Sequence, residues 1–270
     1  MSEQIYTFRD PSFNLNQAYY YTLLIQIDEK SFSYAITYKQ DLMAWGTNCN
    51  LAELSDPQEL AEELTATYKK VIIGVPSGIF TLIPDALFSK DQIGNYARLL
   101  DVSSDERVLA QPLDNQNYII YKVNESTLLT AQKFGLQNVV YLNKGWITAA
   151  AQDNPGNQDL YLHTENSKAT FLYFKNGAIR FYNNFDYQTE GDLGYYAALV
   201  TEELGLASNN VYFKLSGSLK SGDNFTTSLS RFFPNITFFT PQLLNLPEQI
   251  NAQQILTLAA LTLCGSSEAV

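Results

Sequence analysis

The chain has 270 residues, of which 46% are hydrophobic and 13% aromatic, and its 17 Lys and Arg against 28 Asp and Glu give a formal net charge of −11. A chain this apolar builds a packed core, so intrinsic disorder is excluded, and its length suits two domains. The acidic balance argues against nucleic acid or an anionic membrane as a partner, because affinity for either comes from clustered Lys and Arg.

The first residues and the small number of cysteines narrow the possible classes of protein further. The chain starts without a basic region followed by an apolar run, and its most apolar late stretch, residues 255–264, is about half as long as a membrane span. Cys49, Cys264 and the single His163 exclude a disulfide framework, a zinc site and a His-based triad. We therefore expect a cytoplasmic protein with no direct membrane insertion.

A three-strand meander is expected first. The stretch Thr22–Ile27 is mostly apolar and β-branched, as in a central strand covered on both faces, and strands at residues 32–38 and 42–47 follow after tight turns. Ser55, with a Gln three residues later, has the spacing of a capping box and predicts a helix. Residues 71–75 form a short apolar run typical of a strand in a parallel sheet. The first half thus reads strand, strand, strand, helix, strand.

The same order recurs in the second half. The expected elements are strands at residues 159–163, 170–175, 178–185 and 211–215, and a helix that runs from an N-cap at Thr189 to Gly205. Asn176-Gly177 predicts a hairpin between the second and third of these strands, because a type I′ turn needs positive φ at both central residues. The repeated order indicates a structural duplication.

Residues 79–134 have no counterpart in the second half. We expect a helix from Pro84 to about residue 100, a strand at 118–123 and a helix at 125–134 that Gly135 closes. These elements predict a small subdomain inserted into the first half.

A turn-rich segment, residues 152–158, marks the expected boundary between the halves. We predict a first lobe at residues 1–151, with the insertion at about 79–134, and a second lobe at residues 152–270. An apolar terminal helix is expected at residues 251–264, ended by Gly265.

This duplicated order, with an insertion in the first copy and an apolar terminal helix, resembles the actin-like ATPase superfamily of ribonuclease H-like folds. The resemblance implies an α/β protein with two lobes, each built on a mixed five-stranded sheet. The insertion resembles the extra subdomain of cell-division and type IV pilus assembly members, and the whole chain resembles a small uncharacterised bacterial family of this fold.

The resemblance also implies where ATP and Mg²⁺ would bind. In the first phosphate loop of the superfamily, a strand ends in Asp and is followed by glycine and hydroxyl residues. Here Asp28 and Ser31 match, the glycine is missing, and Glu29 adds a second negative charge. Asp28 also suits an ordinary turn. A nuclease on the same scaffold would need three or four converging carboxylates, and Asp28 alone is suitably placed.

The second and third loops match less well. The second phosphate loop of the superfamily contains two Asp residues and several glycines, and residues 163–170 here retain none of them. Side chains on such a loop block the close approach of backbone to phosphate. The third loop, which holds the adenosine, follows a strand with paired glycines, and Ser216-Gly217-Ser218 keeps one. These three residues also suit a plain strand-to-helix turn.

Two functions follow from this comparison with the superfamily. The first is a non-catalytic protein of the actin-like ATPase fold that binds a protein partner or acts as an assembly adaptor. The alternative is an ATPase with atypical loops that binds ATP and Mg²⁺ with Asp28, Ser31, Ser216, Gly217 and Ser218.

Overall fold

The computed structural model describes residues 7–264, which divide into two compact units. The first unit extends to Trp146 and also contains Leu243–Gln249 and the residues from Thr257 onward; the second contains Ile147–Gln242 and Ile250–Leu256. The sequence predicted a boundary between residues 151 and 152, which places the whole terminal segment in the second lobe. The end of that segment groups with the first unit instead, where Leu261 packs closely on Gly74.

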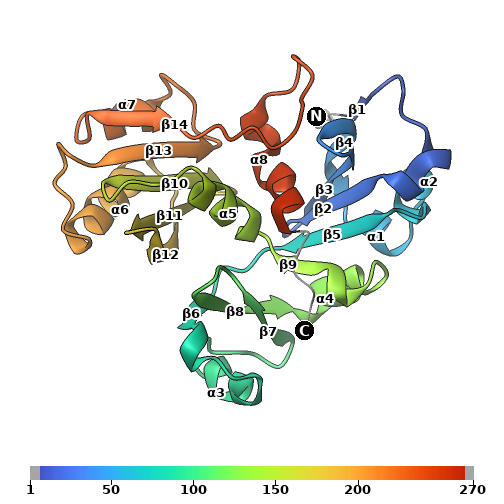
Figure 1. The fold of residues 1–270 in the computed structure, drawn as a ribbon, viewed down its shortest axis with the longest axis horizontal. Helices are drawn as coiled ribbons and strands as arrows, with labels where there is room; N and C mark the ends of the chain where they lie inside the picture. The colour runs from blue at the N-terminus through green and yellow to red at the C-terminus, as the bar shows by residue number, and fades with distance from the viewer. Residues whose placement is uncertain (1–6, 265–270) are drawn as a thin grey trace. The chain divides into compact units, whose positions relative to one another are not determined.

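The first unit is built on a six-stranded mixed sheet, in the order β1-β4-β3-β2-β5-β9 (Figure 1). The strands are β1 (Thr7–Arg9), β2 (Thr22–Ile27), β3 (Ser31–Tyr38), β4 (Asp41–Asn50), β5 (Lys70–Val75) and β9 (Val139–Tyr141). The antiparallel meander and the parallel pairing of β2 with β5 confirm the expected strands, and β9 pairs in parallel with β5. A sixth strand, β1, extends the expected five, because residues 7–9 pair with β4 at its free edge.

Helical structure follows the meander as expected, but the start expected at Ser55 is wrong. The chain forms two short helices, α1 (Ala52–Ser55) and α2 (Ala61–Thr65), and Ser55 ends the first of them. Glu53 Oε2 accepts hydrogen bonds from the backbone N–H groups of Leu60 and Gln58, at 3.0 and 2.9 Å. These two bonds hold the intervening loop and keep the pKa of the Glu53 carboxyl below its usual value. Glu53 therefore holds the loop between α1 and α2, and neither helix has a side-chain cap.

The inserted subdomain has a three-stranded antiparallel sheet in the order β6-β8-β7. Its elements are β6 (Phe80–Pro84), three short helices η2 (Asp85–Leu87), η3 (Lys90–Gln92) and α3 (Ile93–Ala97), β7 (Glu106–Pro112), β8 (Asn117–Asn124) and α4 (Glu125–Gln132). The expected strand and second helix are confirmed as β8 and α4. The long helix expected from Pro84 is wrong, because Pro84 ends a strand paired with β8.

The second unit is built on a five-stranded mixed sheet in the order β12-β11-β10-β13-β14. The strands are β10 (Asp159–Glu165), β11 (Lys168–Lys175), β12 (Ala178–Asp186), β13 (Tyr212–Gly217) and β14 (Asn235–Phe238), with helices α6 (Glu190–Glu203) and α7 (Asn224–Ser230). The Asn176-Gly177 hairpin is confirmed, with φ of 54° and 78°. The Thr189 cap is also confirmed, and Asp192 completes its capping box.

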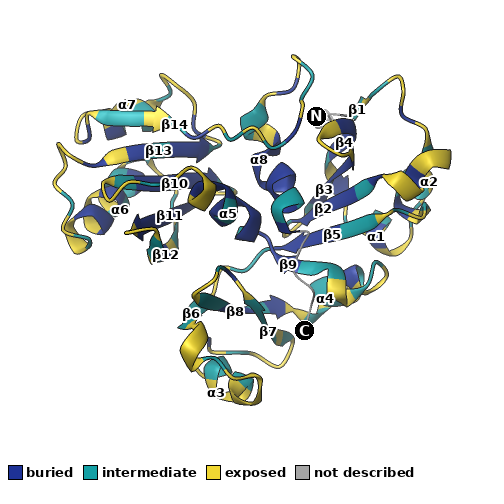
Figure 2. Ribbon diagram, in the orientation of Figure 1, coloured by how far each residue is buried: buried dark blue, intermediate teal, exposed yellow. Residues whose placement is uncertain are grey.

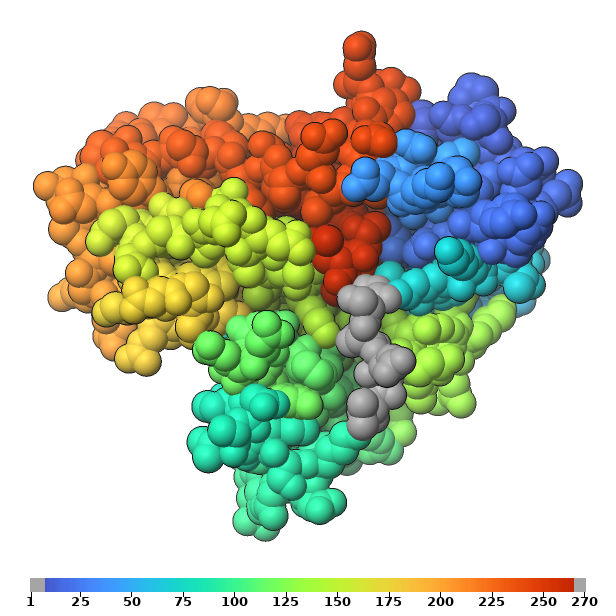
Figure 3. Space-filling view, in the orientation of Figure 1, coloured from blue at the N-terminus to red at the C-terminus, as the bar shows by residue number. Residues whose placement is uncertain are grey.

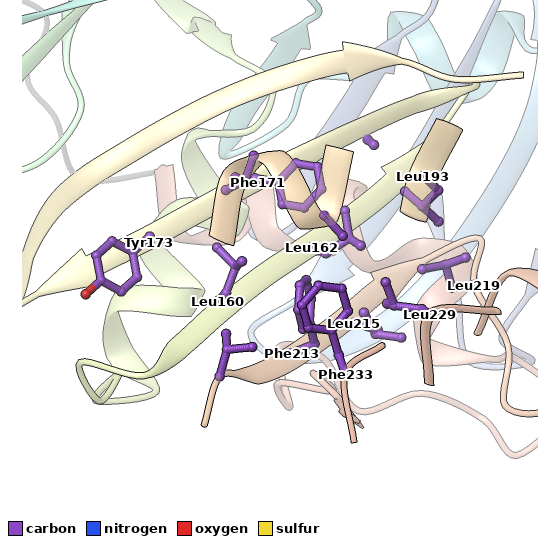
Figure 4. Packing of buried hydrophobic residues seen from close by; sticks show 14 residues of the cluster. Leu160, Leu162, Phe171, Tyr173, Leu193, Phe213, Leu215, Leu219, Leu229 and Phe233 are labelled. Carbon is purple, nitrogen blue, oxygen red and sulfur yellow. The ribbon is translucent and has the colours of Figure 1, made fainter. Parts of the chain in front are cut away.

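One face of this second sheet packs on α6 and α7. Leu160, Leu162 and Phe171 from the strands meet Leu193 of α6 and Leu229 of α7 in one buried cluster (Figure 4). Burying aliphatic and aromatic side chains contributes about 1.5–3 kcal/mol each. This cluster fixes the strand ends on which the candidate site lies. Figure 2 shows the central strands of both units as buried and the short helices of the insertion as mostly exposed.

The chain passes between the units at four points, two of which lie within helices, α5 (Lys144–Gln152) and α8 (Ala252–Ala260). The expected terminal helix is confirmed as α8, continued by a 3-10 helix at Leu261–Cys264; Gly265 lies outside the described residues. Gly145 and Ala260, both in the first unit, approach so closely that a Cβ on Gly145 would lie 2.1 Å from the Ala260 carbonyl oxygen. No helix within residues 7–264 is long and apolar enough to cross a membrane.

Candidate functional site

The candidate site lies at the carboxyl ends of two parallel neighbours, β10 and β13. His163 is opposite Ser216 in the register, and Thr164 is opposite Gly217. The carboxyl edge of parallel strands is where open α/β sheets place their ligands. The sheet therefore brings the predicted residues Ser216, Gly217 and Ser218 together with the end of β10.

The side chains at this edge bond to one another. His163 Nδ1 is 3.1 Å from Ser216 Oγ, and both side chains are buried, at 3% and 0% exposure. Thr164 Oγ1 is 2.9 Å from Ser218 Oγ, and His163 Nε2 is 3.6 Å from a carboxylate oxygen of Glu165. Throughout residues 7–264, every fully buried side-chain nitrogen or oxygen has a hydrogen-bond partner. Because buried polar groups are costly when unpaired, this network stabilises the strand ends.

The backbone N–H groups of the third loop are also bonded within the chain. Gly217 has φ of +87° and donates its N–H to Gln253 Oε1 at 2.8 Å. The Ser218 N–H bonds to the Thr164 carbonyl oxygen at 2.8 Å. After this turn the chain enters α7, whose N-cap Asp223 accepts from Thr226 N–H at 2.7 Å. Ser216 and Gly217 thus end β13, and residues 218–223 connect this strand to α7.

The β10–β11 connection, which matches the second phosphate loop by position, is a two-residue turn. Glu165 and Lys168 are paired across the hairpin, and the two residues between them, Asn166 and Ser167, have φ of 50° and 59°. Positive φ at both positions is the geometry of a type I′ turn. Lys168, which could have donated to a phosphate, donates to Asp186 Oδ1 at 2.6 Å. Every residue of this turn has a side chain.

Asp28 and Ser31, the other predicted site residues, belong to the β2–β3 connection of the first unit. The Asp28 N–H bonds to the Ser31 carbonyl oxygen at 2.9 Å, and Asp28 Oδ1 accepts from Gln26 Nε2 at 3.4 Å. Asp28 is half-buried and Glu29 is exposed. Their part in cofactor binding stays a prediction. In residues 7–264, no three His, Cys, Asp or Glu side chains are grouped so that they could hold a metal ion.

Two residues of the site had no signal in the sequence. Thr164 differs from the superfamily pattern, so no motif marks it, and Gln253 is 36 residues away from its partner Gly217. Only the pairing of β10 with β13 and the position of α8 bring them to the same edge. A periodicity of apolar residues locates the strands but gives no information on a side-chain contact at this separation.

Comparison with known proteins places the chain in a family. A family model described as "Protein of unknown function (DUF3822)" matches residues 10–236, so the chain belongs to this family. A comparison with curated proteins finds no match.

Solved structures show the fold. A protein of unknown function with an actin-like ATPase fold, from Bacteroides thetaiotaomicron VPI-5482, is 20% identical with a TM-score of 0.77, over 93% of this chain and 98% of that one. A chain of the PilM-PilN type IV pilus biogenesis complex is 12% identical with a TM-score of 0.56, over 92% of this chain and 99% of that one. The chain therefore has the actin-like ATPase fold, as the sequence predicted.

Proposed function

We propose that this protein is a non-catalytic member of the actin-like ATPase fold that works by binding a protein partner, as an adaptor in an assembly. The observation that supports this most strongly is the two-residue β10–β11 turn, in which Asn166 and Ser167 stand where the superfamily has a glycine-containing phosphate loop. Phosphate binding by a loop needs several backbone N–H groups that can approach the ligand closely. A tight turn with a side chain on every residue offers few backbone N–H groups that a phosphate could approach closely.

The residues present fit ATP and Mg²⁺ poorly. The N–H groups of Gly217 and Ser218 are already bonded within the chain, Lys168 is paired with Asp186, and Glu29 adds negative charge beside Asp28. A triphosphate bound at the second unit would have to break these bonds, and a phosphate bound beside Asp28 in the first unit would meet an added carboxylate; each costs binding free energy. We therefore derive no catalytic step through ATP.

The alternative is an ATPase that binds Mg²⁺ through Asp28, and its half-buried position at the end of β2 is the observation in its favour. Assaying phosphate release from Mg-ATP by the wild type and by Asp28→Asn separates the two. We expect no release above blank from either protein and equal melting temperatures. A wild-type activity that the isosteric Asp28→Asn abolishes would establish the alternative.

We propose the inserted subdomain as the partner surface. Leu87 and Leu99 are 70% and 66% exposed, although both are large and apolar. The segment that carries Leu87 is held firmly: Phe88 stacks on Tyr118 with ring centroids 3.7 Å apart, and Tyr96 Oη donates to the Leu87 carbonyl oxygen at 2.8 Å. Figure 3 shows atoms of the insertion, coloured cyan to green, at the molecular surface. Exposed apolar residues on a rigid support are typical of protein-binding sites.

An adaptor of this kind is a role that the fold allows. The similar PilM-PilN structure is a complex of two proteins, so the fold accommodates a protein partner. Cys49 and Cys264 are free thiols, in accord with a cytoplasmic location. The formal net charge of −11 disfavours a nucleic-acid partner.

Affinity purification from the native cells tests the surface. The double variant Leu87→Asp, Leu99→Asp should lose the partners that the wild type recovers, with little change in melting temperature, because both side chains are exposed. Tyr195→Asp is the matched control, since Tyr195 is 63% exposed on α6 in the second unit. Partners that survive the double leucine variant but are lost with Tyr195→Asp would move the binding surface to the second unit.

A further inference from the structure

Gln253 connects the start of α8 to the edge of the second sheet through both ends of its side-chain amide. Its Oε1 accepts from the Gly217 N–H at 2.8 Å, and its Nε2 donates to the Phe239 carbonyl oxygen at 2.8 Å. Gly217 ends β13, and Phe239 directly follows β14. One planar amide therefore bridges the ends of two neighbouring parallel strands.

The two backbone groups that hold Gln253 are fixed without it. The Phe239 N–H bonds to the Leu215 carbonyl oxygen at 2.7 Å, which continues the β13–β14 pairing by one residue. Gly217 is held by its pairing with Thr164 across the sheet and by the bond from the Ser218 N–H to the Thr164 carbonyl oxygen. The donor and the acceptor thus keep their spacing independently of the group that they bind.

A donor and an acceptor at fixed spacing select a ligand with the complementary pair. A primary amide has one carbonyl oxygen and one NH₂ in a single plane, so it satisfies both groups at once. A carboxylate of the same shape would satisfy Gly217 but place an oxygen against the Phe239 carbonyl oxygen, and a tertiary amide has no N–H for Phe239. The Gly217 N–H and the Phe239 carbonyl oxygen therefore distinguish a primary amide from a carboxylate and from a tertiary amide.

We propose that the Gly217 N–H and the Phe239 carbonyl oxygen form a two-point binding site for a primary amide, which Gln253 fills from within the chain. Gln253 is half-buried, so the site is at the surface rather than in the core. A group tethered to the same chain competes with ligands in solution at a high effective concentration. The site accordingly opens to an external amide only when Gln253 is displaced, which releases the start of α8 from the strand ends. The site stands independently of whether the protein is an adaptor.

Removing the tethered amide tests the site directly. In the Gln253→Ala protein, both backbone groups lose their partner, and added propionamide should replace the missing group. The readout is the amide resonance of Gly217 in protein labelled with ¹⁵N-glycine, where the chain's 14 glycines give few signals. We expect the Gly217 resonance to shift in Gln253→Ala and to return toward its wild-type position, saturably, as propionamide is added.

Melting temperature gives a second readout. At about five times its dissociation constant, propionamide should raise the melting temperature of Gln253→Ala by about 2 °C or more. N,N-Dimethylpropionamide lacks the donor and should give neither effect, and Gln254→Ala, an exposed neighbour on α8, should behave like the wild type. The external amide could be a glutamine side chain of another protein or a small molecule. A short peptide with one central Gln distinguishes the two: if the site recognises a protein side chain, contacts of the peptide backbone should make the peptide bind more tightly than propionamide.

The Gln253→Glu protein keeps the test decisive if Gln253→Ala folds poorly. The introduced carboxylate would retain an acceptor for the Gly217 N–H but repel the Phe239 carbonyl oxygen, so propionamide should displace it more easily than it displaces the native glutamine. If propionamide moves neither the Gly217 resonance nor the melting temperature of either folded variant, or if dimethylpropionamide acts equally well, the site does not exist as described.

Discussion

Gly217 and Thr164 are so close across the β10–β13 pair that a Cβ on Gly217 would lie 2.1 Å from the Thr164 carbonyl oxygen. Gly217 also has φ of +87°, which residues with a side chain rarely adopt. The same Thr164 oxygen accepts the Ser218 N–H at 2.8 Å. Steric space and backbone conformation therefore both require glycine at the point where β13 leaves the sheet.

Gly217→Ala should lower the free energy of unfolding by about 3 kcal/mol or more, because the positive φ and the backbone clash add. Gly205→Ala is the matched control: Gly205 has φ of +66°, but nothing lies within 4 Å of the point that a Cβ would occupy there. It should cost only about 1 kcal/mol. Urea denaturation of both variants measures the difference, and equal losses would show that the close approach to Thr164 is unimportant.

The close approach of Gly145 to Ala260 predicts a second strong effect. A Cβ on Gly145 would lie 2.1 Å from the Ala260 carbonyl oxygen, and backbone atoms cannot move away as a flexible side chain can. Gly145→Ala should therefore cost about 3 kcal/mol. Gly194 in α6 has open space around it, so Gly194→Ala should stabilise the protein by about 0.5–1 kcal/mol. Chemical denaturation that finds both changes neutral would contradict the packing at Gly145.

The inserted subdomain should show a pH-dependent stability that comes from Glu106. Bonds from the Ser103 N–H and hydroxyl, and then from Lys122 Nζ, lower the pKa of Glu106 from its ordinary 4.5 to about 2. A carboxyl whose pKa is lower in the folded state stabilises the fold above its unfolded pKa and loses that contribution as the pH falls. The stabilisation from Glu106 should therefore be complete above about pH 5 and disappear between about pH 4.5 and pH 2.

Thermal unfolding of Glu106→Gln against the wild type measures this contribution. The variant should melt at a lower temperature at neutral pH, and the two curves should converge as the pH approaches about 2. Asp91→Asn, at an exposed position of the same subdomain, controls for the loss of one negative charge. A difference between Glu106→Gln and the wild type that is independent of pH would show that the bonds from Ser103 and Lys122 do not depend on the ionised carboxylate.

The sequence predicted the repeated core well because its signals are local. Asn176-Gly177 defines a hairpin by backbone conformation alone, and Thr189 with Asp192 defines a helix start by hydrogen bonds within four residues. The strand β14 was missed because residues 235–238 carry only a short apolar pattern, and its pairing with β13 is not local. Local signals were thus enough for the duplicated order and the fold class.

The two incorrect helix starts, at Pro84 and Ser55, also have physical causes. Pro84 looked like the start of a helix, since proline suits a first helical turn, but its pairing with Asn117 in β8 makes it the end of a strand. Ser55 had the spacing of a capping box, and the carboxylate of Glu53 took the backbone donors instead. Tertiary pairing decided both cases, and it also placed Gln253 at Gly217, which no sequence pattern indicated.

The central claim is that the phosphate loops of this actin-like ATPase fold no longer bind a nucleotide. Isothermal titration calorimetry of the full chain with Mg-ATP tests it most directly, with Mg-ADP as a second ligand. We expect no saturable heat with either, and no change in melting temperature, whereas a ligand at about a hundred times its dissociation constant would stabilise the fold by about 2.7 kcal/mol. Saturable binding of Mg-ATP would contradict the account, and a weakening of that binding by Asp28→Asn would assign the site to Asp28.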